Sequence, residues 1–167
     1  MTPGAPESAT DLDRAMMARA LELADLAASE GEVPVGAVVY ETATGRVLGE
    51  GRNARERDRQ PWAHAEFIAV QRACDAIGDW RLNDATLCVT LEPCPMCAGL
   101  IVNARVGRVV YGAADPKAGA ADTLYELLTD DRLNHRCDVI AGVQADASAE
   151  KLRAFFAGLR SGRREAD

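Results

Sequence analysis

The sequence predicts an α/β protein with three layers (α/β/α), in which a five-stranded mixed sheet carries helices on both faces. Apolar runs typical of strands alternate along the chain with segments whose apolar residues recur at helical spacing. The first two strand-like runs are separated only by the turn sequence TATG, which indicates a hairpin before the alternating part begins. Strands that alternate with helices favour a sheet covered on both sides.

The elements begin with a helix and the hairpin. Apolar residues at helical spacing predict a helix over residues 11–30, and Thr10 with Asp13 resembles a capping box at its start. The β-rich run VPVGAVVY at 33–40 and the run RVLGEG at 46–51 predict the two strands of the hairpin.

The rest of the chain alternates between the two kinds of element. Gly78 marks the end of one predicted helix, and Pro95 suits the first turn of another. The predicted elements are, in order, a helix at 64–77, a strand at 85–91, a helix at 95–104, a strand at 107–113, a short helix at 123–129, a strand at 137–143 and an amphipathic helix at 148–160.

The length of 167 residues fits a single domain, which we place at residues 10–160. We expect residues 1–9 to be a disordered lead and residues 161–167 a disordered basic tail. The amino-terminal residues lack the features of a secretory signal, and no apolar run reaches the roughly 18 residues of a membrane span. We therefore expect a cytoplasmic protein without a membrane partner, and the odd count of five cysteines argues against a disulfide framework.

The charge distribution is uneven. The net charge of −7 taken alone argues against a nucleic-acid partner. Residues 1–32 carry most of the excess acid, whereas residues 52–59 hold four arginines and residues 150–167 hold five basic residues. Local basic patches can bind a phosphate backbone, but on charge alone solvated faces are the simpler interpretation.

Two short motifs carry the chemistry of the chain. Cys94 and Cys97 are three residues apart at a predicted helix start, so both sulfurs can reach one point. His64 and Glu66 open another predicted helix, and we expect the two helix starts to meet at one pocket. Two thiolates and one imidazole suit zinc and leave a fourth position for water, whose pKa the metal lowers to about 7. Glu66 is then a carboxylate outside the ligand set that can shuttle protons.

Other interpretations of the cysteines are a redox pair and a closed structural zinc site. A closed site needs a fourth ligand, and the chain offers Cys74, Cys88, Cys137 and His135. Cys74 and Cys88 are more typical of small buried hydrophobic residues, and His135 of a structural histidine. Both motifs together, with proline directly before the first cysteine, favour the open catalytic site of the zinc deaminases.

Residues 12–160 resemble the bacterial tRNA-specific adenosine deaminase (TadA) family of the cytidine deaminase-like zinc hydrolases. The resemblance rests on the stretches EVPVGAVV, GEGRN, AHAE, WRLNDATLCVTLEPCPMCAG, RVGRVVYGAADPKAGA, LNHR and LRAFF. It implies a cytidine deaminase-like fold and conversion of adenosine to inosine, with the tRNA wobble position as the site of reaction. It also implies one zinc ion per subunit, a tRNA anticodon loop as partner and a homodimer, to which residues 98–106 are apolar enough to contribute.

The resemblance assigns a role to each matching residue. His64, Cys94 and Cys97 would bind zinc, and Glu66 would protonate the ring nitrogen and then the departing ammonia. The substrate contacts it implies are Asn53 and the Ala65 backbone on the base edge, Val35 and Leu91 as pocket walls, Asp115 and Lys117 on the target nucleotide and its neighbours, and Phe155, Phe156 and Arg160 on the anticodon loop.

These substrate contacts have structural alternatives. Val35 and Leu91 are also typical of core residues, and Asn53 of a turn residue. Asp115 before proline is typical of a turn start, and Arg160 of a cation that stabilises a helix carboxyl end.

The sequence leaves two further functions open. Trp62 follows Gln60 and Pro61 before AHAE, where the family commonly has Asp-Pro-Thr, and this difference and the acidic charge favour deamination of a free base or nucleoside such as guanine or cytosine. A non-enzymatic binding module with a structural zinc is the third possibility.

Overall fold

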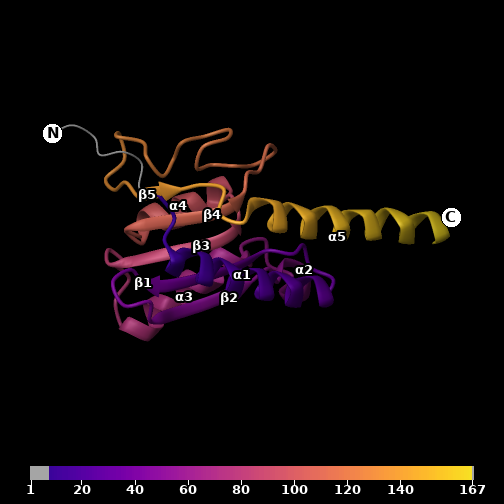
Figure 1. Cartoon of the computed structure of the whole chain (residues 1–167), viewed down its shortest axis with the longest axis horizontal. Helices are drawn as coiled ribbons and strands as arrows, with labels where there is room; N and C mark the ends of the chain where they lie inside the picture. The colour runs from indigo at the N-terminus through magenta and orange to yellow at the C-terminus, as the bar shows by residue number, and fades with distance from the viewer. Residues whose placement is uncertain (1–7, 167) are drawn as a thin grey trace.

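Five strands form one mixed sheet in the order β2-β1-β3-β4-β5 (Figure 1). The computed structural model describes residues 8–166, and the side chains of residues 8–162. The strands are β1 (Gly36–Glu41), β2 (Val47–Arg52), β3 (Ala85–Leu91), β4 (Arg108–Ala113) and β5 (Asp138–Ile140). β1 is antiparallel to both β2 and β3, whereas β3, β4 and β5 run parallel. Because parallel strands end at the same sheet edge, the segments that follow β3 and β4 lie side by side.

Helices cover both faces of the sheet, as predicted. They are α1 (Asp11–Ser29), α2 (Arg55–Asp58), α3 (Ala65–Ile77), α4 (Pro95–Asn103) and α5 (Ala145–Ala166). α1 and α5 pack on one face, and α3 and α4 on the other (Figure 1). No helix in the described part of the chain combines the length and the hydropathy of a membrane span.

The alternation of side chains along β1 builds two cores. Val38 and Tyr40 point towards α1, where they pack with Met17, whereas Val39 points to the opposite face and packs with Val70 of α3. All five residues are at most 2% exposed. Each apolar side chain buried in this way contributes roughly 1.5–3 kcal/mol relative to an exposed one, so the sheet register is strongly specified.

Glycines in β2 bring α3 close to the sheet. A Cβ atom at Gly51 would lie 2.2 Å from the carbonyl oxygen of Ala65, and one at Gly49 would lie 2.3 Å from that of Ala69. No other residue type fits at these positions without a shift of the helix. The start of α3 is therefore held directly over the end of β2.

Four local predictions need correction. Residues 123–129 form turns rather than a helix. Backbone N–H groups of this segment donate hydrogen bonds to the Glu92 carboxylate and to the carbonyl oxygens of Gly119 and Ala120, which lie outside it. The four-residue helix α2 was not predicted, since the sequence RERD has no apolar face. β5 ends at Ile140 because Gly142 adopts a φ of 79°.

The fourth correction concerns α5, which begins at Ala145 and continues to Ala166. Residues 161–166, expected as a disordered basic tail, are helical, and the carboxyl-terminal half of α5 projects beyond the body of the molecule (Figure 1). Residues 1–7 of the expected disordered lead, and Asp167, lie outside the described residues.

Candidate active site

Two helix starts meet beside the start of β1 and the end of β3. His64 is the N-cap residue of α3, and Cys94 is the N-cap residue of α4, where Pro95 occupies the first turn. The Nδ1 atom of His64 lies 3.6 Å from the Sγ atom of Cys94 and 3.6 Å from the Sγ atom of Cys97. All three atoms lie within 4.8 Å of one another, which brings together the three predicted metal ligands.

The donor set fits a tetrahedral zinc ion with an open position. Typical bond lengths of about 2.3 Å to sulfur and 2.0–2.1 Å to nitrogen place the two kinds of atom about 3.5 Å apart around such an ion. Among residues 8–162, whose side chains the structure describes, the group holds no fourth histidine, cysteine or carboxylate ligand. His135 instead hydrogen-bonds the carbonyl oxygen of Val106 at 2.7 Å, as expected of a structural histidine.

The thiols are arranged to accept a cation. A hydrogen bond from Cys97 lowers the pKa of Cys94 to about 4. The same hydrogen bond and burial raise the pKa of Cys97 above its ordinary value, and the hydrogen bond with Cys94 raises the pKa of His64. The lowered pKa of Cys94 favours its thiolate form, and the positive ends of two helices lie beside it.

Glu66 lies in the first turn of α3 and is 4% exposed. Burial raises the pKa of its carboxyl group to about 7. A carboxyl group with a pKa near neutrality both takes up and releases protons readily. Glu66 faces the same cavity as His64 and Cys94, so a carboxyl group suited to proton transfer lies beside the candidate metal-ligand group.

The cavity has a volume of about 180 Å³. Apolar residues form much of its wall, and polar and titratable side chains form the rest. Its lining residues are Val33, Val35, Asn53, Arg55, His64, Glu66, Leu91, Glu92, Cys94, Asp115 and Ala118. A small recess with few convergent polar groups and titratable side chains is typical of a site for one small ring system.

Comparison with known proteins identifies the family. The model of MafB19-like deaminases matches residues 11–160. A tRNA-specific adenosine deaminase of Bacillus subtilis is 45% identical over 154 residues, which cover 92% of this chain and 94% of the relative. The chain belongs to the tRNA-specific adenosine deaminase family.

Solved structures agree with this membership. A tRNA:A34 deaminase studied for A-to-I editing at the wobble position has a TM-score of 0.78 and 40% identity, over 83% of this chain and 99% of that one. A guanine deaminase from Nitrosomonas europaea has a TM-score of 0.78 at 23% identity, over 92% of this chain and 89% of that one, and supports the fold alone. The predicted cytidine deaminase-like fold and the enzyme class of a deaminase are thus confirmed.

The structure of this deaminase brings some predicted substrate contacts together and leaves others apart. Val35, Asn53, Leu91 and Asp115 line the cavity, and Ala65 is fully buried at the start of α3. Four others lie outside the lining residues: Lys117 is exposed beyond Asp115, and Phe155, Phe156 and Arg160 lie on α5, where Phe155 is half-buried and the other two are exposed.

Sequence reasoning missed four lining residues. Val33 and Ala118 are small apolar wall residues without a motif of their own, and Arg55 lies on the unpredicted helix α2. Glu92 had a signal, because it directly precedes the Pro-Cys pair, but no chemistry was assigned to it. The side chain of Asp115 accepts hydrogen bonds from the N–H groups of Lys117 and Ala118, so Asp115 also serves as a turn start.

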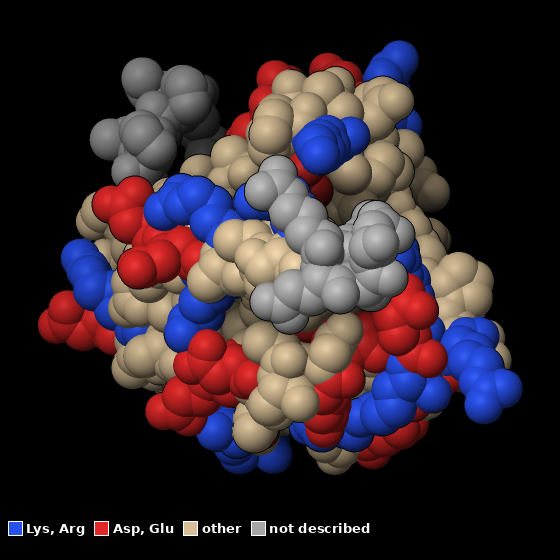
Figure 2. Space-filling view, turned by 90° about the vertical axis from the view of Figure 1, so that its right-hand side faces the viewer, with Lys and Arg blue, Asp and Glu red and all other residues tan. Residues whose placement is uncertain are grey.

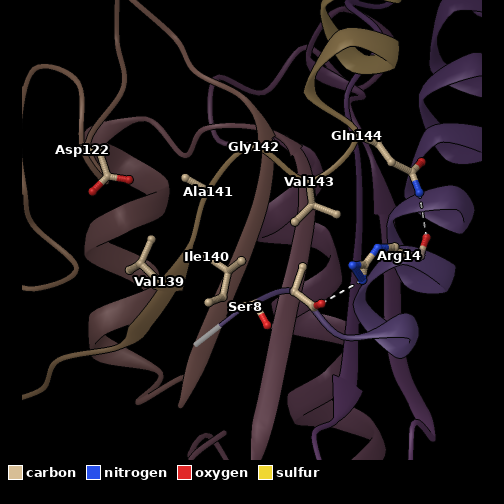
Figure 3. A pocket seen from close by; sticks show the side chains of 10 residues that line it. Ser8, Arg14, Asp122, Val139, Ile140, Ala141, Gly142, Val143 and Gln144 are labelled. Carbon is tan, nitrogen blue, oxygen red and sulfur yellow. Dashed lines mark hydrogen bonds between the residues drawn. The ribbon is translucent and has the colours of Figure 1, made fainter. Parts of the chain in front are cut away.

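A second hollow, of about 610 Å³, lies on another part of the surface (Figure 3). Its walls are the segment Val139–Gln144, the residues Ser8 and Ala9, Arg14 and Asp122. Gln144 donates to the carbonyl oxygen of Arg14, and Arg14 donates to that of Ala9 (Figure 3). It contains neither cysteine nor histidine, so the deaminase chemistry belongs to the smaller cavity.

Proposed function

We propose that this chain converts adenosine to inosine at the wobble position of a tRNA anticodon, with one zinc ion per subunit. The observation that carries the proposal is the position of Glu66, outside the group of His64, Cys94 and Cys97 but in the same cavity. The names of the relatives and of the matching wobble-editing structure support adenosine in tRNA as the substrate.

The metal would be held by His64, Cys94 and Cys97. Zinc, when bound, supplies a Lewis acid that activates water. In the hydrolysis, the water oxygen bonds to the ring carbon that carries the amine, the carbon–nitrogen bond breaks and ammonia leaves. Glu66 takes a proton from the water, delivers it to the ring nitrogen, and protonates the departing amine with the second proton.

The cavity residues would orient the base. The Asn53 side chain would hydrogen-bond the base, the Ala65 backbone would read its edge, and Val35 and Leu91 would pack on its faces. A recess of about 180 Å³ admits one base and not a stem, so the target nucleotide must leave the base stack to react. An unpaired anticodon loop makes this step least costly.

Contacts outside the cavity would come from Asp115, Lys117 and the exposed face of α5, with Phe156 and Arg160 on the anticodon loop. Figure 2 views the molecule from the side towards which α5 projects. On this side of the molecule, basic and acidic side chains are interspersed. Several arginines are already paired, for example Arg52 with Glu30. RNA binding would therefore depend on local contacts rather than on a broad positive field.

Deamination of a free base or nucleoside remains the second candidate, and the net charge of −7 favours it.

One experiment distinguishes the two candidate functions. Zinc-loaded protein is incubated with a stem-loop that carries an ACG anticodon and, separately, with guanine, cytosine and adenosine. The products are identified by their masses, with the Glu66→Gln variant as the control. We expect inosine in the stem-loop alone. Products from the free compounds without inosine in the RNA would favour the second candidate.

We further propose that two copies form a homodimer through α3 and α4, in the cytoplasm where tRNA is available. Ala98, Ile101 and Val102 are buried inside the single chain, so only part of the stretch 98–106 is free for an interface. A mostly apolar hollow lies beside it, lined by Phe67, Val70, Gln71, Cys74, Trp80, Leu100, Asn103 and Ala104. A Leu100→Arg variant that elutes at half the wild-type mass would support this surface.

A further inference from the structure

Glu92 occupies an unusual position between the cavity and the metal-ligand helix. It follows β3 directly and precedes Pro93 and Cys94, and it is 2% exposed. Its Oε1 atom accepts hydrogen bonds from the backbone N–H groups of Ala121, Asp122 and Thr123, at 3.1, 2.8 and 3.0 Å. Its Oε2 atom accepts from the N–H group of Asp115 at 2.9 Å and from the Thr123 hydroxyl.

These contacts exclude a proton-transfer role. A carboxylate offers about four lone-pair positions, and five donors already point at Glu92. Protonation would place a hydrogen against N–H donors and leave some of them without an acceptor in a buried site. Glu92 therefore differs from Glu66, although both are buried glutamates that line the same cavity.

The donors come from both ends of one loop, residues 115–123. Asp115 and Ala118 of this loop line the cavity. Backbone hydrogen bonds from Glu92 N–H to Ala113 and from Ala120 N–H to Pro93, both 2.8 Å, fasten the loop to the same strand end. The Glu92 carboxylate thus sits inside the loop and joins its two ends.

Gly119 allows this arrangement. A Cβ atom at residue 119 would lie 2.3 Å from Oε2 and 2.4 Å from Cδ of Glu92. The loop therefore closes around the carboxylate at a distance that only glycine permits, and Gly119 and Glu92 form one packing unit.

We propose that Glu92 is a positioning residue that fixes loop 115–123 against the cavity and thereby sets the affinity for the target nucleotide. This inference rests on the proposed function, in which Asp115 and Lys117 contact that nucleotide and its neighbours. Glu92 acts through the loop and leaves the metal ligands and Glu66 unchanged, so its effect falls on substrate binding.

Glu92→Gln tests the proposal with almost no change in shape. One oxygen becomes an NH₂ group, which faces N–H donors whichever way the amide is turned. Loss of hydrogen bonds to a charged group should raise the KM for the stem-loop by about tenfold to hundredfold, with a much smaller change in kcat. Hydrogen exchange should accelerate at the amides of Asp115 or of Ala121–Thr123, whichever meet the NH₂ group, and the zinc content should stay at the wild-type level.

Two further variants keep the test decisive if Glu92→Gln folds poorly. Thr123→Val removes only the hydroxyl donor and should raise KM by a smaller factor. Gly119→Ala pushes on the carboxylate from the loop side, and combined with Glu92→Gln it should add little. Glu50→Gln is the matched control, because Glu50 of β2 is ion-paired with Arg19 of α1 and lies outside the cavity. It should leave both KM and the loop amides unchanged.

The outcomes separate this proposal from the proposed function. Unchanged exchange at the loop amides in Glu92→Gln overturns the proposal, whatever the activity. Loss of zinc together with a fall in kcat also overturns it, because Glu92 would then act through the metal site. If the wild type forms no inosine in any stem-loop, the proposed function fails. In that case, faster hydrogen exchange at the loop amides of Glu92→Gln still supports the conclusion that Glu92 holds the loop. If Glu92→Gln then binds the true substrate with the same affinity as the wild type, the proposed role of Glu92 in binding is overturned.

Discussion

The carboxylate of Asp13 accepts hydrogen bonds from both terminal nitrogens of Arg108, at 2.6 and 2.7 Å. Asp13 is 1% exposed and Arg108 is 7% exposed, so the pair is buried between α1 and β4. The hydroxyl of Tyr40 and the backbone N–H of Thr10 also donate to Asp13. One carboxylate thus joins the capping box of α1 to the middle of the sheet.

Replacement of Asp13 by asparagine should destabilise the fold strongly. Breaking this buried ion pair while the charge of Arg108 stays in place typically costs about 3–5 kcal/mol. Urea unfolding at neutral pH measures this loss in free energy of unfolding. Tyr40→Phe, which removes one hydrogen bond and no charge, should cost only about 1 kcal/mol. Equal losses in the two variants would show that the ion pair contributes little.

The same pair should make stability depend on acid pH. Burial alone would raise the pKa of Asp13, but the hydrogen bonds from Arg108 and Tyr40 outweigh it and hold the pKa below the ordinary value of 3.8. Because the folded-state pKa is lowered, the contribution is complete above the unfolded-state pKa of about 3.9 and is lost as the pH falls below it. Between about pH 4 and pH 2 the metal-free wild type should lose stability faster than metal-free Asp13→Asn. Parallel pH profiles of the urea midpoint would contradict this prediction.

Glu66→Gln should separate metal binding from catalysis. The side chain lies outside the group of His64, Cys94 and Cys97, so the variant should bind zinc as the wild type does. Without the proton shuttle, inosine formation should fall by about 10²–10⁴-fold or more. Cys97→Ser is the contrasting variant, which should lose both the metal and the activity. Elemental analysis of the purified chains gives the zinc content, and zinc loss in Glu66→Gln would argue that this glutamate is a ligand.

The cysteine pair of the candidate metal-ligand group was predictable from sequence because its geometry is local, whereas His64 lies 30 positions before Cys94 and was placed with the pair through the expected meeting of two helix starts. Cys94 and Cys97 share one helix turn, and Pro95 correctly marked the start of that helix. The helix predicted at 123–129 was wrong, although its sequence has helical spacing. The N–H group of Thr123 donates a hydrogen bond to Glu92 instead, a contact between residues 31 positions apart. Patterns within a short window cannot show such a competitor. Val35 and Asn53 likewise line the cavity only through tertiary packing, because the sequence alone favoured a core position for Val35 and made a turn position equally plausible for Asn53.

Gly51→Ala should disturb the start of α3. The added Cβ would lie 2.2 Å from the carbonyl oxygen of Ala65, the residue between His64 and Glu66. Moving the helix costs about 1–3 kcal/mol, and it shifts His64 away from the two thiols. We expect a lower melting temperature and weaker zinc affinity in competition with a chelator. Gly99→Ala is the control for an added methyl group, since no atom beyond its chain neighbours and its own helix backbone lies within 4 Å of the added Cβ, and it should leave the zinc affinity unchanged and not lower the melting temperature.

The exposed face of α5 should matter for RNA and not for a free nucleoside. Phe156 is 43% exposed and packs edge-to-face on Phe155, at a centroid distance of 5.4 Å. Phe156→Ala combined with Arg160→Ala should raise the KM for the stem-loop by about tenfold, because stacking and one phosphate contact are lost. Zinc content and thermal stability should not change. An unchanged KM for the stem-loop would remove α5 from the RNA interface.

The edges of the sheet limit how this protein associates. At one edge, β5 has only three residues. At the other edge, β2 carries Glu50 and Arg52, whose side chains are tied by ion pairs to Arg19 and Glu30. A short edge and a charged, bridged edge are poor templates for a strand from a neighbouring molecule. Self-association in concentrated solution should therefore proceed through helical surfaces, without the β-rich aggregates that open sheet edges nucleate.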